Sequence, residues 1–352
     1  MHIIITGGAG FIGQYLAARL VEAGHEVTAL DNLSEQVHAD AEASRRRFPG
    51  PVIEGDVADA AAWAGLPRAH AIMHLAAETG TGQSMYEQDR YRRVNVDGTR
   101  LAGDTARAWG VPLIAMSSRA VYGEGRRACP EHGDRYGTVC CEQSTPAPSR
   151  ESDPHHPVSV YGETKSEGEA ALREHAAAIP VDIVRPQNVV GFGQALHNPY
   201  TGVLAAFLAR LREGRPLSVY GDGTATRDFI HVSDVAALLA WLVEHPNEVG
   251  EVRAINSGTG VRTDLTELAT FARDAAPTST GEIEYVDVHR AGDIDHAVAD
   301  LTFADSIGAP RPQMSSKDAI QDFIRRSWEV PGADSSAWDD ALRELGDRGL
   351  TS

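Results

Sequence analysis

Short apolar runs alternate with longer segments of helical spacing through the first half of the chain. The runs are rich in β-branched residues, which is typical of strands buried on both faces. We predict six such strands, at His2–Thr6, Glu26–Asp31, Val52–Glu54, Ala71–Leu75, Leu113–Ser117 and Val181–Arg185. Between the first two, a helix over Ile12–Ala23 would end at Gly24, a residue suited to the position after a helix. This alternation predicts an α/β fold with a doubly wound parallel sheet.

The pattern changes after residue 185, where loops rich in Pro and Gly separate further helical segments. Those segments are Gly202–Arg212, Val232–Glu244 and Asp264–Ala275. We therefore expect a first domain over residues 1–185 and a smaller mixed α/β lobe over 186–330. Residues 124–157 are rich in Pro, Gly, Ser, Glu and His and are expected to form an inserted loop. Residues 331–352 form a C-terminal tail with one amphipathic stretch, either docked or mobile.

Charge and hydropathy exclude several classes of protein. The formal net charge is −18, from 50 acidic and 32 basic residues, so most of the surface would repel nucleic acid. The longest helical apolar window, Val235–Val243, is far shorter than a membrane span. The first residues enter a strand without a basic or cleavable leader pattern, so we expect a cytoplasmic protein that contacts no membrane.

A glycine-rich turn follows the first strand, with Gly7, Gly10 and Gly13 placed ahead of the first helix. Glycines there permit a tight turn and close approach of a pyrophosphate, which the helix N-terminus attracts. Asp31 ends the second strand, where a carboxylate accepts the ribose hydroxyls of NAD and repels the 2′-phosphate of NADP. A glycine turn alone would be a weak indication. Strand, glycines, helix and acid in register predict a Rossmann-type NAD site.

Two further motifs point to proton transfer beside the nicotinamide. Tyr161 and Lys165 are four residues apart, so on a helix they share a face, and the ammonium would lower the phenol pKa. That spacing also fits an ordinary surface helix. Ser118, however, follows the fifth strand, whose carboxyl end faces the ligand crevice of a parallel sheet. Ser118, Tyr161 and Lys165 together indicate a catalytic triad for proton transfer.

With these motifs the chain resembles the extended short-chain dehydrogenase/reductase family, specifically the nucleotide-sugar epimerases. The resemblance extends from Met1 to about Ile324 and includes His74–Ala77, Asn95–Thr99, Arg185–Gly191, Tyr220–Gly223, Arg227–Val235 and Arg290–Asp293. Three segments are similar to the dTDP-L-rhamnose 4-epimerase group in particular: Gly82–Glu87, Ser118–Gly125 and Asn198–Leu204. Glu78–Ser84 and Asn198–Leu204 would line the hexose pocket.

The resemblance implies a set of binding residues, a bound NAD, a nucleotide-diphosphate sugar and a homodimer formed by the helices before and around Tyr161. The implied NAD contacts are Gly7, Gly10, Phe11, Ile12, Gly13, Asp31, Asn32, Asp56, Val57, Leu75, Ala76, Ala77, Asn95, Tyr161 and Lys165. The implied substrate contacts are Thr79, Thr81, Ser84, Ser118, Arg119, Asn188, Tyr220, Arg227, Arg290 and Asp293.

The function expected from these residues is inversion at C4 of the sugar through a transient 4-keto intermediate. Similar 4,6-dehydratases carry an Asp-Glu pair where this chain has Arg119 and Ala120, so dehydration is disfavoured. An NAD-dependent 4-ketoreductase or dehydrogenase and a non-catalytic dinucleotide-binding regulator are the alternatives.

The three cysteines lie close together in the inserted loop. Cys129, His132, Cys140 and Cys141 offer four ligands of the kind that zinc prefers. The dTDP-L-rhamnose 4-epimerase group resembles this region but with a longer insertion and a two-knuckle zinc-ribbon pattern, whereas here two cysteines are adjacent. Both a structural zinc site and free thiols fit the sequence.

Overall fold

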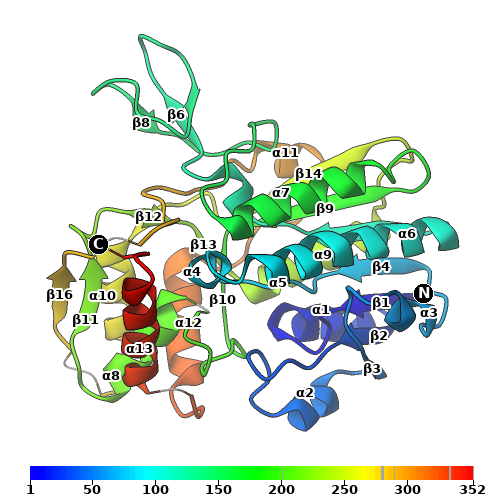
Figure 1. The fold of residues 1–352 in the computed structure, drawn as a ribbon, viewed down its shortest axis with the longest axis horizontal. Helices are drawn as coiled ribbons and strands as arrows, with labels where there is room; N and C mark the ends of the chain where they lie inside the picture. Colours follow the sequence, from blue (N-terminus) through cyan, green and yellow to red (C-terminus); the bar gives the residue numbers. More distant parts are fainter. Residues whose placement is uncertain (201, 279–280, 289, 333, 352) are drawn as a thin grey trace.

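Seven parallel strands form the central sheet of the computed structural model, which describes residues 1–200, 202–278, 281–288, 290–332 and 334–351 (Figure 1). The strands are β1 (His2–Thr6), β2 (Glu26–Asp31), β3 (Val52–Glu54), β4 (Ala71–His74), β5 (Leu113–Met116), β9 (Val181–Pro186) and β14 (Val252–Ser257). Their order across the sheet is β14-β9-β5-β4-β1-β2-β3. The predicted doubly wound parallel sheet is confirmed, because the chain reverses direction across the sheet between β1 and β4.

Helices cover both faces of the sheet. On one face, Leu16 and Leu20 of α1 pack with Leu239 of α9 against the buried side chains of Ile3 and Ile5. The other face carries α3, α6 and α7, whose apolar residues form a second cluster. The helices around the sheet are α1 (Phe11–Glu22), α2 (Ala41–Arg47), α3 (Ala60–Ala64), α4 (Thr81–Ser84), α5 (Gln88–Arg92), α6 (Thr99–Trp109), α7 (Val160–Arg173), α9 (Val232–Glu244) and α11 (Thr302–Ser306), with a π-helical turn over Arg93–Gly98 and a 3₁₀ turn over Arg119–Tyr122.

The chain returns to this sheet after it has entered the second lobe. α9 packs beside α1, and β14 pairs in parallel with β9, from Val252 opposite Val181 to Ser257 opposite Pro186. The expected division at residue 185 therefore differs from the observed layers. The first lobe includes residues 232–257, and the two lobes are interleaved along the chain.

The second lobe is built from short sheets and helices around its own apolar core. Its elements are β10 (Asn188–Val190), α8 (Val203–Arg212), β11 (Leu217–Tyr220), β12 (Thr226–Arg227), β13 (Phe229–His231), β15 (Thr263–Asp264), α10 (Leu265–Ala275), β16 (Ile283–Val286) and α12 (Ser316–Ser327). Leu208, Leu268 and Phe323 lie at the centre of this core, one from each of α8, α10 and α12.

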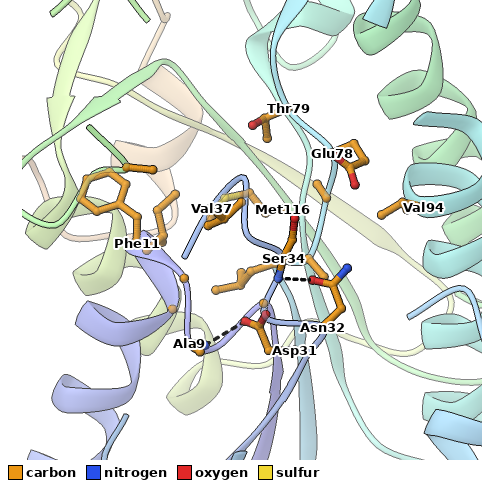
Figure 2. Close-up of a pocket in the computed structure, with 18 of the residues that line it drawn as sticks. Ala9, Phe11, Asp31, Asn32, Ser34, Val37, Glu78, Thr79, Val94 and Met116 are labelled. Atoms are coloured by element: carbon orange, nitrogen blue, oxygen red, sulfur yellow. Dashed lines mark hydrogen bonds between the residues drawn. The ribbon is translucent and has the colours of Figure 1, made fainter. Parts of the chain in front are cut away.

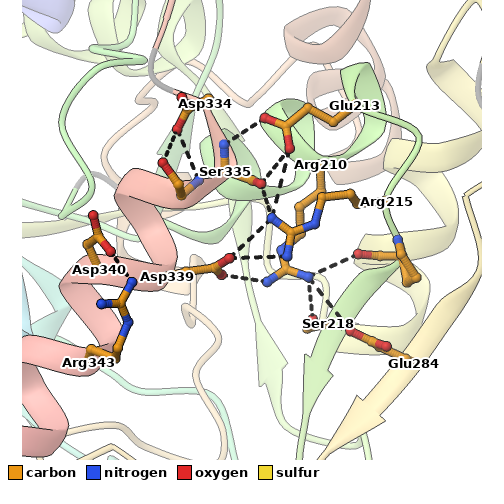
Figure 3. A network of polar contacts seen from close by, with 12 residues as sticks. Arg210, Glu213, Arg215, Ser218, Glu284, Asp334, Ser335, Asp339, Asp340 and Arg343 are labelled. Atoms are coloured by element: carbon orange, nitrogen blue, oxygen red, sulfur yellow. Dashed lines mark hydrogen bonds and ion pairs between the residues drawn. The ribbon is translucent and has the colours of Figure 1, made fainter.

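The last helix, α13 (Ser335–Asp347), docks on this lobe (Figure 3). Arg210 of α8 and Arg215 both pair with Asp339, at 2.8 Å and 3.1 Å respectively. The expected tail is thus docked over the part that the structure describes. Within the described ranges no helix is both long and apolar enough to cross a membrane.

The inserted segment forms a small antiparallel sheet in the order β7-β6-β8, which projects from the body of the molecule (Figure 1). Its strands are β6 (Arg126–Ala128), β7 (Arg135–Tyr136) and β8 (Thr145–Pro146).

Candidate active site

The turn between β1 and α1 leaves no room for side chains at its glycines. Gly7 has a φ of 66°, and a Cβ placed there would lie 2.9 Å from the backbone nitrogen of Ala76. A Cβ on Gly13 would lie 2.5 Å from the carbonyl oxygen of Gly7. Gly10 occupies the N-cap of α1 and provides no side-chain cap, so the first N–H groups of this helix have no side-chain acceptor there. A turn of this shape holds an anion at the helix N-terminus.

Asp31 ends β2 beside this turn, as Figure 2 shows. One carboxylate oxygen accepts a hydrogen bond from the backbone N–H of Ala9 at 3.0 Å, and the other accepts from Leu33 at 3.0 Å. His38 Nε2 lies 3.4 Å from the same carboxylate. The acid therefore has a fixed orientation at the edge of the glycine turn.

A cleft of about 400 Å³ lies along the carboxyl ends of the strands (Figure 2). This volume is in the range of small-molecule sites. Of the predicted residues, it is lined by Gly7, Gly10, Phe11, Ile12, Gly13, Asp31, Asn32, Asp56, Val57, Leu75, Ala76, Ala77, Thr79, Ser118, Tyr161 and Lys165. The structure thus brings the expected dinucleotide residues and the Ser-Tyr-Lys triad to one cleft.

The three triad residues come from two elements. Ser118 follows β5, and its hydroxyl accepts a hydrogen bond from the backbone N–H of Ala120 at 3.1 Å. Tyr161 and Lys165 lie one turn apart on α7, and the Lys165 ammonium donates to the carbonyl oxygen of Met116 at 3.0 Å. Burial lowers the pKa of Lys165 to about 8, against the opposing charge of Glu169.

The Tyr161 phenol is recessed in the cleft, and burial raises its pKa above the ordinary value. A hydrogen bond with Ser118 and the positive charge of Arg119 act in the opposite direction. Ser118 and Arg119 are therefore the groups that lower the pKa of the Tyr161 phenol in this structure. The Lys165 ammonium, which was expected to do so, instead donates to the backbone carbonyl of Met116.

Three predicted residues form hydrogen bonds that connect the cleft residues to neighbouring elements. The Asn95 side chain accepts from the backbone N–H of Glu78 at 2.9 Å and donates to Thr164 Oγ1 at 3.0 Å, which ties the cleft wall to α7. The Ser84 hydroxyl accepts from the backbone N–H of Tyr161 at 3.0 Å and donates to the carbonyl oxygen of Thr81. Asn95, Thr81 and Ser84, which were expected to contact NAD or substrate, thus contact other protein groups in this structure and are not part of the cleft lining.

The predicted diphosphate residues gather in the second lobe. The Arg227 guanidinium donates to the carbonyl oxygen of Ile294 at 2.6 Å. Arg290 pairs with Asp293 at 3.0 Å and lies over the ring of Tyr220 at 5.2 Å. Arg227 and Arg290 thus lie in one charged cluster with Asp293, outside the cleft lining.

Several polar groups near the cleft have no partner among the described residues. Asn188 Oδ1 and Gln187 Oε1 are buried without a hydrogen bond. Buried polar atoms are normally hydrogen-bonded, so unsatisfied oxygens such as these, close to a cleft, suit an incoming polar ligand.

Arg119 follows Ser118 directly in the chain. Burial, together with the nearby charge of Arg227, lowers the pKa of Arg119 to about 10.

The sequence reasoning did not assign Gln187 or His38, which line the cleft, whereas Tyr200, which also lines it, belongs to the segment expected in the hexose pocket. The Tyr200 hydroxyl hydrogen bonds with Tyr86 at 2.8 Å and donates to Glu344 of α13 at 3.0 Å, so the C-terminal helix borders the site. His38 and Tyr200 lie in loops without periodicity, and only the resemblance pointed to the segment around Tyr200. Of the segment Asn198–Leu204, Asn198 also lines the cleft, and Thr201 lies outside the described residues.

The cysteine motif lies apart from the cleft, on the projecting sheet. Cys129, His132, Cys140 and Cys141 are brought together there.

Comparisons with known proteins agree with this geometry. The model of the NAD dependent epimerase/dehydratase family matches residues 3–258. The chain is 36% identical over 341 residues to a dTDP-L-rhamnose 4-epimerase of Burkholderia thailandensis, covering 90% of this chain and 92% of that protein. Among solved structures, a UDP-glucose 4-epimerase of Thermotoga maritima with UDP-glucose has a TM-score of 0.78 and 26% identity, with 93% and 98% of the two chains covered. MoeE5 in complex with UDP-glucuronic acid and NAD has a TM-score of 0.75 and 26% identity, with 93% and 99% covered. By the extent of these matches, the chain belongs to the NAD dependent epimerase/dehydratase family.

Proposed function

We propose that this protein is an NAD-dependent nucleotide-sugar 4-epimerase that inverts C4 of a nucleotide-diphosphate hexose. The observation that carries the proposal is the convergence of Ser118, Tyr161 and Lys165 at the same cleft as the glycine turn and Asp31. Relatives named dTDP-L-rhamnose 4-epimerase and UDP-glucose 4-epimerase support the same reaction. More distant relatives include a decarboxylase and a 4,6-dehydratase, so the family alone does not fix the reaction.

The residues of the cleft fit NAD. The side-chain-free turn around Gly7 and the uncapped N-terminus of α1 suit its pyrophosphate, and Asp31 suits its adenosine ribose. When bound, NAD supplies a hydride acceptor that can return the hydride to the sugar. Lys165, whose ammonium is held at the floor of the cleft, would contact the nicotinamide ribose.

Residues of the chain itself transfer the proton and hold the diphosphate of the substrate. Tyr161 takes the proton from the sugar 4-hydroxyl, and Ser118 holds that hydroxyl and relays the proton. Arg227 and Arg290 bind the diphosphate, because the guanidinium fork matches phosphate oxygens. Held only at this tether, the 4-keto sugar turns over and presents its other face before Tyr161 returns the proton. Asp293 would bind the nucleotide ribose.

Nuclear magnetic resonance in D₂O tests the reaction. Purified protein without added cofactor is incubated with dTDP-, UDP-, GDP- and CDP-sugars, starting with dTDP-L-rhamnose and UDP-glucose. We expect a C4-inverted product with no deuterium in the ring, because the hydride returns internally. Deuterium at C3 or C5, or turnover only with added NADH, would contradict the proposal and favour keto–enol chemistry or a reductase.

The choice of NAD over NADP is expected to depend on the charge of Asp31. The substitution Asp31→Asn keeps the shape but removes the charge that would bind the ribose hydroxyls. Hydrogen bonds to charged groups contribute about 1.5–3 kcal/mol, so NAD affinity should fall about 10- to 100-fold. Titration of cofactor-stripped protein with NAD and NADP measures this, and Asp274→Asn, which changes an exposed acid on α10 of the second lobe, is the control. An unchanged ratio of the two affinities would contradict the assignment.

The pH profile is expected to depend on Arg119, whose charge lowers the pKa of Tyr161. Because the phenolate is the base, kcat/KM should rise as pH rises towards that pKa. In Arg119→Gln the pKa of Tyr161 rises, so this acid limb should move to higher pH. The profile of kcat/KM against pH measures the shift, with Arg135→Gln on the projecting sheet as control. A limb that stays in place would show that Arg119 does not act on the phenol.

The homodimer and the cytoplasmic location expected from the sequence stay predictions. Light scattering coupled to size-exclusion chromatography measures the oligomeric state directly.

A further inference from the structure

Four metal-ligating side chains converge on the projecting sheet formed by β6, β7 and β8. The ligand atoms of Cys129, His132, Cys140 and Cys141 all lie within 4.8 Å of one another. Cys129 Sγ is 3.4 Å from His132 Nδ1 and 3.5 Å from Cys141 Sγ, and the sulfur atoms of Cys140 and Cys141 are 4.0 Å apart. The adjacent cysteines therefore both present their sulfur atoms to the same cluster.

Two of these separations match a tetrahedral zinc site, and the remaining ones are longer, up to 4.8 Å. Zinc binds thiolates at about 2.3 Å and imidazole nitrogen at about 2.0–2.1 Å, so tetrahedral ligands lie about 3.4–3.8 Å from one another. The two contacts of Cys129 have this spacing. The other ligand atoms would have to approach one another by about 1 Å to reach it. Three thiolates and one imidazole are a ligand set typical of structural zinc.

The projecting sheet has polar contacts, such as the ion pair of Arg126 with Asp134 at 3.1 Å, but no apolar core of its own among the described residues. Its strands are two or three residues long, and no residue of 126–146 belongs to the three apolar clusters of the described chain. Val139, a large apolar residue of this segment, is 65% exposed. So short a sheet without a core is marginal in water, and small units of this kind are commonly held by a metal or by disulfides.

We propose that Cys129, His132, Cys140 and Cys141 bind one structural zinc ion that holds the projecting sheet in place. A disulfide between Cys129 and Cys141 is the competing explanation, but it would leave Cys140 and His132 of the same cluster without a role. The zinc site does not depend on the proposed epimerase activity, because the cluster is outside the cleft.

Metal content and a spectroscopic probe test the proposal. Protein purified with reductant and zinc sulfate, then desalted, should contain about one zinc ion per chain. Cys129→Ser should lose it, while Glu131→Gln, a neighbouring carboxylate outside the cluster, should keep it. Wild-type protein stripped with a chelator and refilled with Co²⁺ should show thiolate-to-cobalt charge-transfer bands. This measurement decides the question even if Cys129→Ser fails to fold.

Two results would overturn the proposal. One is wild-type protein that retains no zinc and gives no thiolate–cobalt absorption. The other is a disulfide between Cys129 and Cys141, found by mass spectrometry of the alkylated protein as purified under reducing conditions.

Discussion

Replacing Tyr161 with phenylalanine is expected to lower kcat by about 10²- to 10⁴-fold, the usual contribution of a general acid–base group. The substitution removes only the phenol oxygen. The ring should keep its edge contact with Tyr91, at 6.5 Å between centroids, and the backbone N–H should keep its bond to Ser84. The protein should therefore fold and retain NAD while losing the proton acceptor. Steady-state kinetics on the sugar identified by magnetic resonance measures the loss.

A matched variant separates loss of the base from loss of any buried hydroxyl. Tyr15 of α1 donates to the carbonyl oxygen of Phe192 at 3.0 Å and lies outside the cleft lining. Tyr15→Phe should therefore keep kcat near the wild-type value. Wild-type turnover in Tyr161→Phe, or an equal loss in both variants, would remove Tyr161 from the reaction.

The central sheet could be predicted closely because its strands are continuous apolar runs. The missing strand, β14, shows why the prediction was incomplete. Its sequence Val252–Ser257 mixes Arg, Asn and Ser with apolar residues, as an edge strand can. Arg253 of this strand reaches across to Asp182 of β9 at 2.6 Å, a pairing that no local period encodes. The interleaved lobes follow from that same long-range pairing.

The candidate site could be predicted where local geometry fixes the spacing of its residues. The glycine turn, Asp31 and the pair Tyr161 and Lys165 are such cases, since their separations follow from a strand end or a helical turn. Groups that depend on tertiary contacts gave no such pattern. Glu169 and Arg185, for example, are 16 residues apart in the chain on different elements, yet they form a fully buried ion pair.

That ion pair leads to the largest expected effect on stability, the substitution Arg185→Met. Both side chains are at most 2% exposed, and the guanidinium donates to both Glu169 oxygens, at 2.9 Å and 2.6 Å. It also donates to the Tyr122 hydroxyl at 2.8 Å. Removing one partner of a buried pair leaves an uncompensated charge and costs about 3–5 kcal/mol in the free energy of unfolding. Urea denaturation at neutral pH measures this.

The pH dependence of that cost identifies its cause. Burial alone would raise the pKa of Glu169, but the hydrogen bond and charge of Arg185 hold it below the ordinary value. A carboxyl group whose pKa is lowered by folding stabilises the folded state at pH values above its unfolded-state pKa. This contribution to the free energy of unfolding is lost as the pH falls through the folded-state pKa. Without Arg185 the pKa of Glu169 should rise above its ordinary value, so the deficit of Arg185→Met should shrink in acid.

Two further variants complete this test. Adding Glu169→Gln to Arg185→Met should restore part of the lost stability, because no buried charge then remains. The matched control is the exposed Arg92 of α5, which pairs with Glu163 and Glu167 of α7, the helix that also carries Glu169. Arg92→Met should change the free energy of unfolding by about 1 kcal/mol or less. A similar loss in both single arginine variants would mean that burial of the Arg185–Glu169 pair is not what stabilises α7 against β9.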